Sequence, residues 1–190
     1  MADILHKTSP KYYVTKLHNP TFDDIVDVYE DRVNGWLIEP AKILNSYEHA
    51  GLSVLHIIFA YFEGHAAFYH GIDTNNQSNK CFRRAFKVVF PQISSHPLVD
   101  QIMDILWFDG RNGLAHIGFP RRRIVLQDGD PVFRFEVNEN NDKIIRVHID
   151  RNKIVQGVEE HLVRYIARLR DPQEKVLRDN FITAWNIIHK

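Results

Sequence analysis

The segment 107–118 holds the side chains of this chain that are best suited to chemistry. Arg111, Asn112 and His116 lie within six consecutive residues of it. An arginine offers a planar fork of N–H groups to a phosphate, a histidine exchanges protons near neutral pH, and an asparagine can orient the imidazole or hold a sugar or base. Together they can cleave RNA without a metal ion. The histidine deprotonates a ribose 2′-hydroxyl, the 2′-oxygen attacks the adjacent phosphorus, and the arginine stabilises the developing charge.

The spacing of these residues is compatible with one cleft. Asn112 and His116 are four residues apart and therefore share a helical face. Arg111 lies about 140° from His116 around an ideal helix, but its long side chain can reach the same cleft where Gly110 and Gly113 weaken or kink the helix. The alternative is structural: Arg111 pairs with a carboxylate such as Asp109, and His116 is a hydrogen-bonded core histidine.

Three arginines, Arg121, Arg122 and Arg123, follow the segment directly. Beside a phosphate site they would add salt-sensitive affinity for an RNA backbone. The alternative is that they form a solvated turn before an edge strand.

The elements that must position these residues are mainly helical. Thr21 and Asp24 form a predicted capping box at the start of a first helix, which ends near Gly35. Pro40 opens the next helix, which is expected to run over 40–70. It is apolar around nearly its whole circumference, which is typical of the buried centre of a bundle. Further helices are expected at about 79–90, from Leu98 through His116, at about 152–170 and from Asp171 to the end.

One polar stripe interrupts the apolar helix at 40–70. His49, His56, Glu63 and His70 are each seven residues apart, so they lie on one face. The stripe is either a seam facing solvent or a partner helix, or the lining of a polar cleft that Glu63 and His56 would support. Neighbours on the stripe are roughly 10 Å apart, beyond the reach of a single ion, so no metal site is expected.

Short β-branched or alternating runs at 123–127, 132–137 and 144–149 predict strands. Turn-forming residues at 128–131 and 138–142 separate them. We therefore expect an antiparallel three-stranded meander at about 123–150, inserted between helices.

The composition describes an ordinary globular chain of one domain over residues 1–190. The formal net charge is zero, so no global field attracts nucleic acid or an anionic membrane. The single cysteine, Cys81, fits a reducing compartment. The first twenty residues lack a secretory signal, and the longest apolar run, 52–62, includes His56 and is too short to span a bilayer. These features predict a cytoplasmic protein without a membrane segment.

The run Arg111-Asn112-Gly113-Leu114-Ala115-His116, near the end of a later helix, resembles the Arg-x4-6-His motif of the HEPN superfamily. A polar residue commonly follows the arginine in that family, as Asn112 does here. The resemblance covers about 21–120 and 152–170. It implies a mainly α, up-and-down helical bundle that dimerises, so that two copies of the motif face each other across one cleft. It also implies that Arg111 and His116 are catalytic, that Asn112 assists, and that no cofactor is needed.

Many HEPN members are metal-independent endoribonucleases of toxin–antitoxin, antiviral or RNA-processing systems, whereas others only bind RNA, nucleotides or protein partners. The resemblance thus implies a homodimeric endoribonuclease with an antitoxin or other protein partner. The alternative is a non-catalytic module that binds a nucleotide, RNA or a protein. HEPN toxins that pair with a small nucleotidyltransferase usually carry a tyrosine two residues after the histidine, where this chain has Gly118.

Overall fold

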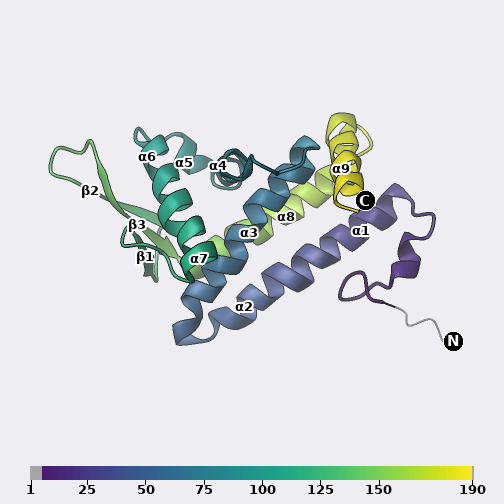
Figure 1. The fold of residues 1–190 in the computed structure, drawn as a ribbon, viewed down its shortest axis with the longest axis horizontal. Coiled ribbons are helices and arrows are strands. Elements are labelled where there is room, and N and C mark those ends of the chain that lie inside the picture. Colours follow the sequence, from purple (N-terminus) through teal and green to yellow (C-terminus); the bar gives the residue numbers. More distant parts are fainter. Residues whose placement is uncertain (1–5, 190) are drawn as a thin grey trace.

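The structure is a computed structural model that describes residues 6–189, and it is mainly helical with one small sheet (Figure 1). The helices are α1 (Phe22–Val33), α2 (Glu39–Asn45), α3 (Gly51–His70), α4 (Ser78–Val89), α5 (Pro91–Ser94), α6 (Val99–Asp104), α7 (Asn112–Ile117), α8 (Arg151–Arg170) and α9 (Lys175–Ile188), and the strands are β1 (Ile124–Gln127), β2 (Phe133–Val137) and β3 (Ile144–Asp150). Short 3-10 turns at Val14–Leu17 and Glu48–Ala50 and π-helical segments at Asn34–Ile38 and Ile105–Arg111 complete the described elements.

Helix α3 lies at the centre of the fold, against α2, α4, α8 and α9 (Figure 1). Its phenylalanines join those of α4 in one aromatic core, with ring centroids 4.5 Å apart for Phe62 and Phe86 and 5.6 Å apart for Phe59 and Phe82. The segment Glu48–His70 has the length and apolar content of a membrane-spanning helix, but 61% of its most apolar window is buried inside the protein. Its apolar residues thus pack as those of a core helix do.

The first helix starts as the sequence predicts. The Thr21 side chain accepts from the Asp24 backbone N–H, and the Asp24 carboxylate accepts from the Thr21 backbone N–H, which confirms the capping box. The predicted end near Gly35 is wrong, because α1 continues through the π-helical segment into α2. The widened turn precedes Pro40, which has no N–H to donate to the helix.

The N-terminal arm packs against this long helix. Asp31 is buried, and its carboxylate accepts hydrogen bonds from the Ser9 hydroxyl at 2.6 Å and the Lys11 backbone N–H at 2.7 Å. A Cβ at Gly35 would collide with the ring of Pro10. Gly35 therefore permits a close approach of the arm rather than ending the helix.

The predicted single helix over 40–70 is interrupted between Asn45 and Gly51. Arg151, at the start of α8, stabilises the chain between α2 and α3, because it donates hydrogen bonds at 3.0 Å to the backbone carbonyls of Tyr47 and Glu48. As a result His49 lies on a 3-10 turn outside α3, and only His56, Glu63 and His70 of the proposed stripe share one helix.

The strands form a mixed sheet in the order β1-β3-β2, at the end of the molecule opposite α9 (Figure 1). Strand β3 is central: Ile149 pairs with Leu126 of the parallel β1 and with Phe133 of the antiparallel β2. The expected antiparallel meander is therefore wrong in its topology, although the three strand positions are confirmed.

Asp150, at the end of β3, explains the strand order. Its carboxylate accepts a hydrogen bond from the Gly129 backbone N–H at 2.6 Å, and its own N–H donates to the Val132 carbonyl at 2.9 Å. The connection from β1 thus crosses the end of β3 before β2 begins, so β1 and β2 lie on opposite sides of β3. The same carboxylate caps α8, accepting from the N–H groups of Asn152 and Lys153.

Candidate active site

The motif lies on one continuous helix that widens in its middle. Helix α6 passes into the π-helical segment Ile105–Arg111, which passes into α7. A Cβ at Gly110 would lie 2.8 Å from Cε2 of Phe59, and one at Gly113 would lie 2.9 Å from the Phe119 carbonyl oxygen. The two glycines thus bring the helix close to α3 on one side and to the chain after α7 on the other. The expected distortion at Gly110 appears as a π-helical widening.

Arg111 is anchored to α3 by an ion pair. Its Nε donates to Oε1 of Glu63 at 2.5 Å, and the two side chains are 26% and 15% exposed. The guanidinium carbon lies 5.1 Å from the centre of the Trp107 ring, within cation–π range. Nη1 also donates to Oδ1 of Asn112 at 3.3 Å. The Nε–H donor is thus used by Glu63, whereas Nη2 makes no hydrogen bond to any of residues 6–189.

A cavity of about 190 Å3 opens beside this ion pair, and we call it the Arg111 cleft. Its lining combines polar side chains from two helices with an apolar floor: His56, Phe59, Ala60, Glu63, Arg111, Leu114 and Ala115. The cleft therefore brings together three of the polar residues predicted from sequence, namely Arg111 and the supporting pair Glu63 and His56.

The other two motif residues lie at different distances from the cleft. Asn112 is half-buried and contacts Arg111 directly. His116 is exposed, one turn further along α7, and it is not among the residues that line the Arg111 cleft. Because Asn112 and His116 share a helical face, the imidazole lies on the same side of α7 as the Asn112–Arg111 contact. A single copy thus presents the arginine in a cleft and an exposed histidine outside the lining of that cleft.

The structural alternative for the motif is confirmed in one part, because Arg111 does pair with a carboxylate, and is wrong in its example, Asp109, and in its core position for His116. The carboxylate partner of Arg111 is Glu63, whereas Asp109 pairs with Arg123. His116 is exposed rather than a core histidine.

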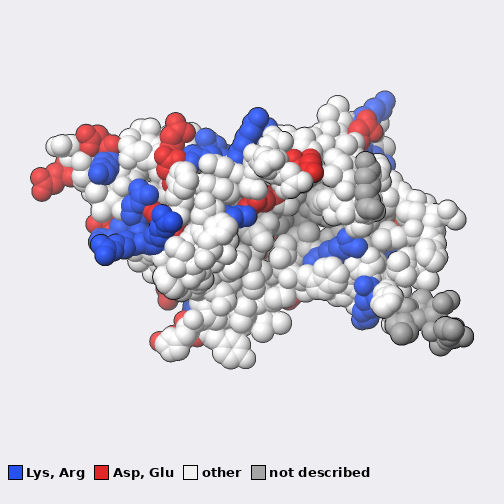
Figure 2. All heavy atoms as spheres, in the orientation of Figure 1, with Lys and Arg blue, Asp and Glu red and all other residues white. Residues whose placement is uncertain are grey.

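All three arginines of the triplet are exposed, and one of them also pairs with a buried carboxylate. Arg123 donates to the carboxylate of Asp109, whose side chain is only 7% exposed. Arg121 contributes its backbone N–H to the Asp109 carbonyl at 2.8 Å, while its side chain and that of Arg122 are exposed. Figure 2 shows basic side chains gathered over the region that Figure 1 labels β1 and β3. All three predicted RNA-binding residues are therefore accessible, and Arg123 also pairs with Asp109.

Sequence reasoning missed the role of Trp107. Trp107 is buried, and the Arg111 guanidinium lies over its ring. Four-residue spacing to Arg111 was the available signal, since residues that far apart are neighbours on a helix.

None of the described residues forms a group of three or more histidine, cysteine or carboxylate side chains that could hold a metal ion. Comparison of the chain with known proteins returned no matching family model, no matching curated protein and no matching solved structure.

Proposed function

We propose that this chain is a metal-independent endoribonuclease of the HEPN type, a homodimer whose two motifs contribute to one composite cleft. The ion pair between Arg111 and Glu63 carries the proposal, because it holds a guanidinium at the edge of a cleft that the motif helix itself lines. Under the proposal the helices form an up-and-down bundle, and the protein acts in the cytoplasm in toxin–antitoxin or antiviral defence, restrained by an antitoxin or another protein partner.

The proposed reaction uses groups that this chain supplies. His116 takes the proton of a ribose 2′-hydroxyl, and the 2′-oxygen forms a bond to the adjacent phosphorus while the bond to the 5′-oxygen breaks. The leaving 5′-oxygen takes a proton from water, so that one Arg111–His116 pair is sufficient for the reaction. Arg111 stabilises the charge on the non-bridging oxygens through its terminal N–H groups, since Nε is engaged by Glu63. The products are a 2′,3′-cyclic phosphate and a 5′-hydroxyl.

Exposed apolar side chains around the motif support a second copy at this face. Phe108, Ile117 and Phe119 are 45%, 47% and 57% exposed, and they flank the motif along the helix and just after it. Large apolar residues grouped on a surface mark interaction sites. A partner that covers them would lie beside His116 and could complete the site that one copy leaves open.

The test is RNA cleavage by the purified protein. Single-stranded and transfer RNAs are incubated in EDTA at several pH values, and the ends of any fragments are identified. We expect cyclic phosphate ends, and loss of cleavage in both Arg111→Ala and His116→Ala. Arg164→Ala and His49→Ala are matched controls, because both side chains are exposed and far from the motif in sequence. Intact RNA under all conditions, with a folded protein, would contradict the proposal.

A non-catalytic binding module is the second candidate, and the position of His116 outside the Arg111 cleft favours it. Such a module would hold a phosphate of an RNA or nucleotide against Arg111 without turnover. Binding that Arg111→Ala weakens and His116→Ala leaves unchanged, with RNA recovered intact, would identify it.

A further inference from the structure

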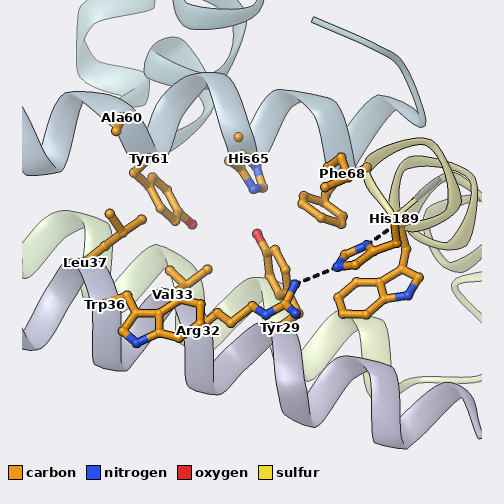
Figure 3. A pocket seen from close by; sticks show the side chains of 13 residues that line it. Tyr29, Arg32, Val33, Trp36, Leu37, Ala60, Tyr61, His65, Phe68 and His189 are labelled. Carbon is orange, nitrogen blue, oxygen red and sulfur yellow. Dashed lines mark hydrogen bonds between the residues drawn. The ribbon is translucent and has the colours of Figure 1, made fainter. Parts of the chain in front are cut away.

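A second cavity lies between α1, α3 and α9 (Figure 3), and Ala60 lines both it and the Arg111 cleft. Its volume is about 310 Å3, at the lower end of the range of small-molecule sites. Its walls are mainly aromatic and include Tyr29, Trp36, Tyr61, Phe68 and Trp185. Figure 2 shows the corresponding face hollowed between α1 and α3. We call this cavity the aromatic pocket.

His65 contributes an unusual polar group to the aromatic pocket. Its side chain is 1% exposed, and neither ring nitrogen has a hydrogen-bond partner among residues 6–189. The imidazole is packed between rings, 4.4 Å from that of His161 and 4.7 Å from that of Tyr165. Figure 3 shows its nitrogens directed into the pocket, toward the hydroxyl ends of Tyr29 and Tyr61.

A buried imidazole without a hydrogen-bond partner lowers the stability of the folded protein. Burial lowers the pKa of His65 well below its ordinary value, so the imidazole is neutral, with one N–H donor and one acceptor nitrogen. Buried polar groups in native proteins are nearly always hydrogen-bonded. A polar atom on a molecule inside the pocket would therefore gain a directed hydrogen bond there.

Arg32 provides a cation at the opposite wall. Its guanidinium lies 5.1 Å from the centre of the Trp185 ring, and its Nη1 is 2.7 Å from Nε2 of His189 (Figure 3). Nε and Nη2 donate to the backbone and hydroxyl of Thr8. Within residues 6–189 no carboxylate lies within ion-pair distance of Arg32, and burial lowers its pKa. A partly buried cation without a counter-ion attracts an anion.

We propose that the aromatic pocket binds a small aromatic acid that carries a hydroxyl or carbonyl group at the end remote from its carboxylate. The carboxylate binds Arg32 beside His189, the ring lies among the aromatic walls, and the remote polar group hydrogen-bonds His65. The proposal does not depend on ribonuclease activity, since none of these three residues lines the Arg111 cleft.

Three related small molecules test separately the proposed contacts with Arg32 and with His65. Binding of 3-(4-hydroxyphenyl)propionate, of 3-phenylpropionate and of the amide of the first acid is measured by isothermal titration calorimetry. We expect the hydroxy acid to bind most tightly. The amide should bind at least about tenfold more weakly, because it lacks the charge. The acid without the hydroxyl should bind roughly threefold to tenfold more weakly, because it leaves His65 unpaired.

Variants assign each preference to a residue. Arg32→Gln should remove the preference for the acid over the amide, and His65→Phe should remove the preference for the hydroxyl while keeping an aromatic wall. Gly64→Leu should abolish binding of all three probes, because Gly64 lines the pocket and a Cβ added there would meet no atom within 4 Å. The leucine side chain would therefore extend into the space that the probe needs. Ala167→Leu, at an exposed position of α8, is the control.

Three results would overturn the proposal. One is that no probe binds the wild-type protein at millimolar concentration. Another is equal binding by Gly64→Leu and wild type, which would put the probe elsewhere. The third is a wild-type dimer that Gly64→Leu dissociates, because a second copy rather than a small acid would then fill the pocket. Loss of RNA cleavage in the motif variants does not bear on any of them.

Discussion

Glu63 and Arg111 are 48 residues apart in the sequence, and their ion pair, with Nε and Oε1 at 2.5 Å, ties α3 to the motif helix. The pair fixes which face of the guanidinium is available. Because Nε is held by the carboxylate, the terminal N–H groups remain for a ligand. Glu63 is therefore a positioning residue of the proposed site.

Breaking the Glu63–Arg111 ion pair should lower the free energy of unfolding. Arg111→Ala leaves a mostly buried carboxylate without its cation, and we expect the free energy of unfolding to fall by about 1–3 kcal/mol. Adding Glu63→Gln should restore part of that loss, since the lone charge is then removed. Urea denaturation measures both. Arg146→Ala breaks an exposed pair with Glu136 and should lower the free energy of unfolding much less. Equal losses in the two arginine variants would contradict this assignment.

Substitutions in the arginine triplet should affect stability at one position and RNA affinity at another. Arg123→Ala leaves the buried Asp109 carboxylate unpaired, so we expect a loss of about 1–3 kcal/mol in unfolding free energy. Arg122→Ala should leave stability unchanged, weaken RNA binding and reduce the salt slope of log K by about 1. Denaturation and salt-dependent binding assays check the two effects. A salt slope that Arg122→Ala leaves unaltered would mean that this side chain does not contact RNA.

Two glycines should respond to alanine in opposite directions. At Gly113 the new Cβ would meet backbone atoms of Phe119 and Pro120 at 2.9 and 3.1 Å, so Gly113→Ala should lower the melting temperature. At Gly64 the helix has open space, and Gly64→Ala should stabilise by up to about 1 kcal/mol through helix propensity. Thermal unfolding of both variants is the measurement. A stabilised Gly113→Ala would mean that the chain after α7 does not pack on this glycine.

Stability should fall as the pH drops from about 6.5 toward 4. Burial, and then the nearby Arg164 cation, lower the pKa of His161 from 6.5 to about 4. Burial, and then His161 and His70, lower that of His65. In this window the unfolded chain binds protons that the folded chain does not, so unfolding free energy declines by up to about 1.4 kcal/mol per pH unit for each histidine. Above pH 6.5 neither residue contributes.

Urea unfolding at pH 7.5, 6 and 5 measures this dependence. His65→Phe removes one of the two titrating groups, and its stability should vary less steeply with pH than that of the wild type. His49→Phe alters an exposed histidine and serves as the control. Identical slopes in wild type and His65→Phe would show that His65 is protonated normally in the folded protein.

A composite cleft should allow complementation. If Arg111 of one copy acts with His116 of the other, a heterodimer of Arg111→Ala and His116→Ala chains keeps one intact pair. Mixing the two inactive variants after subunit exchange should then restore cleavage to roughly a quarter of the wild-type rate, since half of the dimers are heterodimers and each of these keeps one of the two Arg111–His116 pairs of the cleft. No recovery, with exchange confirmed by native mass spectrometry, would mean that both residues must act from the same copy.

Local patterns were sufficient to predict much of the secondary structure. The capping box of Thr21 and Asp24 marked the start of α1, and the β-branched runs marked all three strands. What the sequence could not provide was the outcome of contacts between distant segments. The hydrogen bonds from Arg151 interrupt the helix expected over 40–70, and the Asp150 carboxylate reverses the order of β2 and β3 in the sheet.

The same division holds for the sites. The polar stripe singled out Glu63 and His56 as cleft residues because they share a helix face, and the structure brings both together with Arg111. The ion pair itself had no local signal, and Asp109 was the nearer candidate in sequence. The aromatic pocket was not anticipated at all. Arg32, His65 and His189 come from three distant segments, and no spacing rule connects them.

The π-helical segment Ile105–Arg111 has a consequence for how the motif tolerates insertions and deletions. A wide turn accommodates an additional residue without lengthening the helix by a full turn. Deleting one residue within it would restore an α-helical winding and leave the rotational phase after it nearly unchanged. A deletion in α6, which has no additional residue to lose, would instead rotate everything after it by roughly 100° about the axis. Asn112 and His116 would then swing together away from α3. The rotational phase of α7, and not only the residue count between arginine and histidine, decides whether the motif can work.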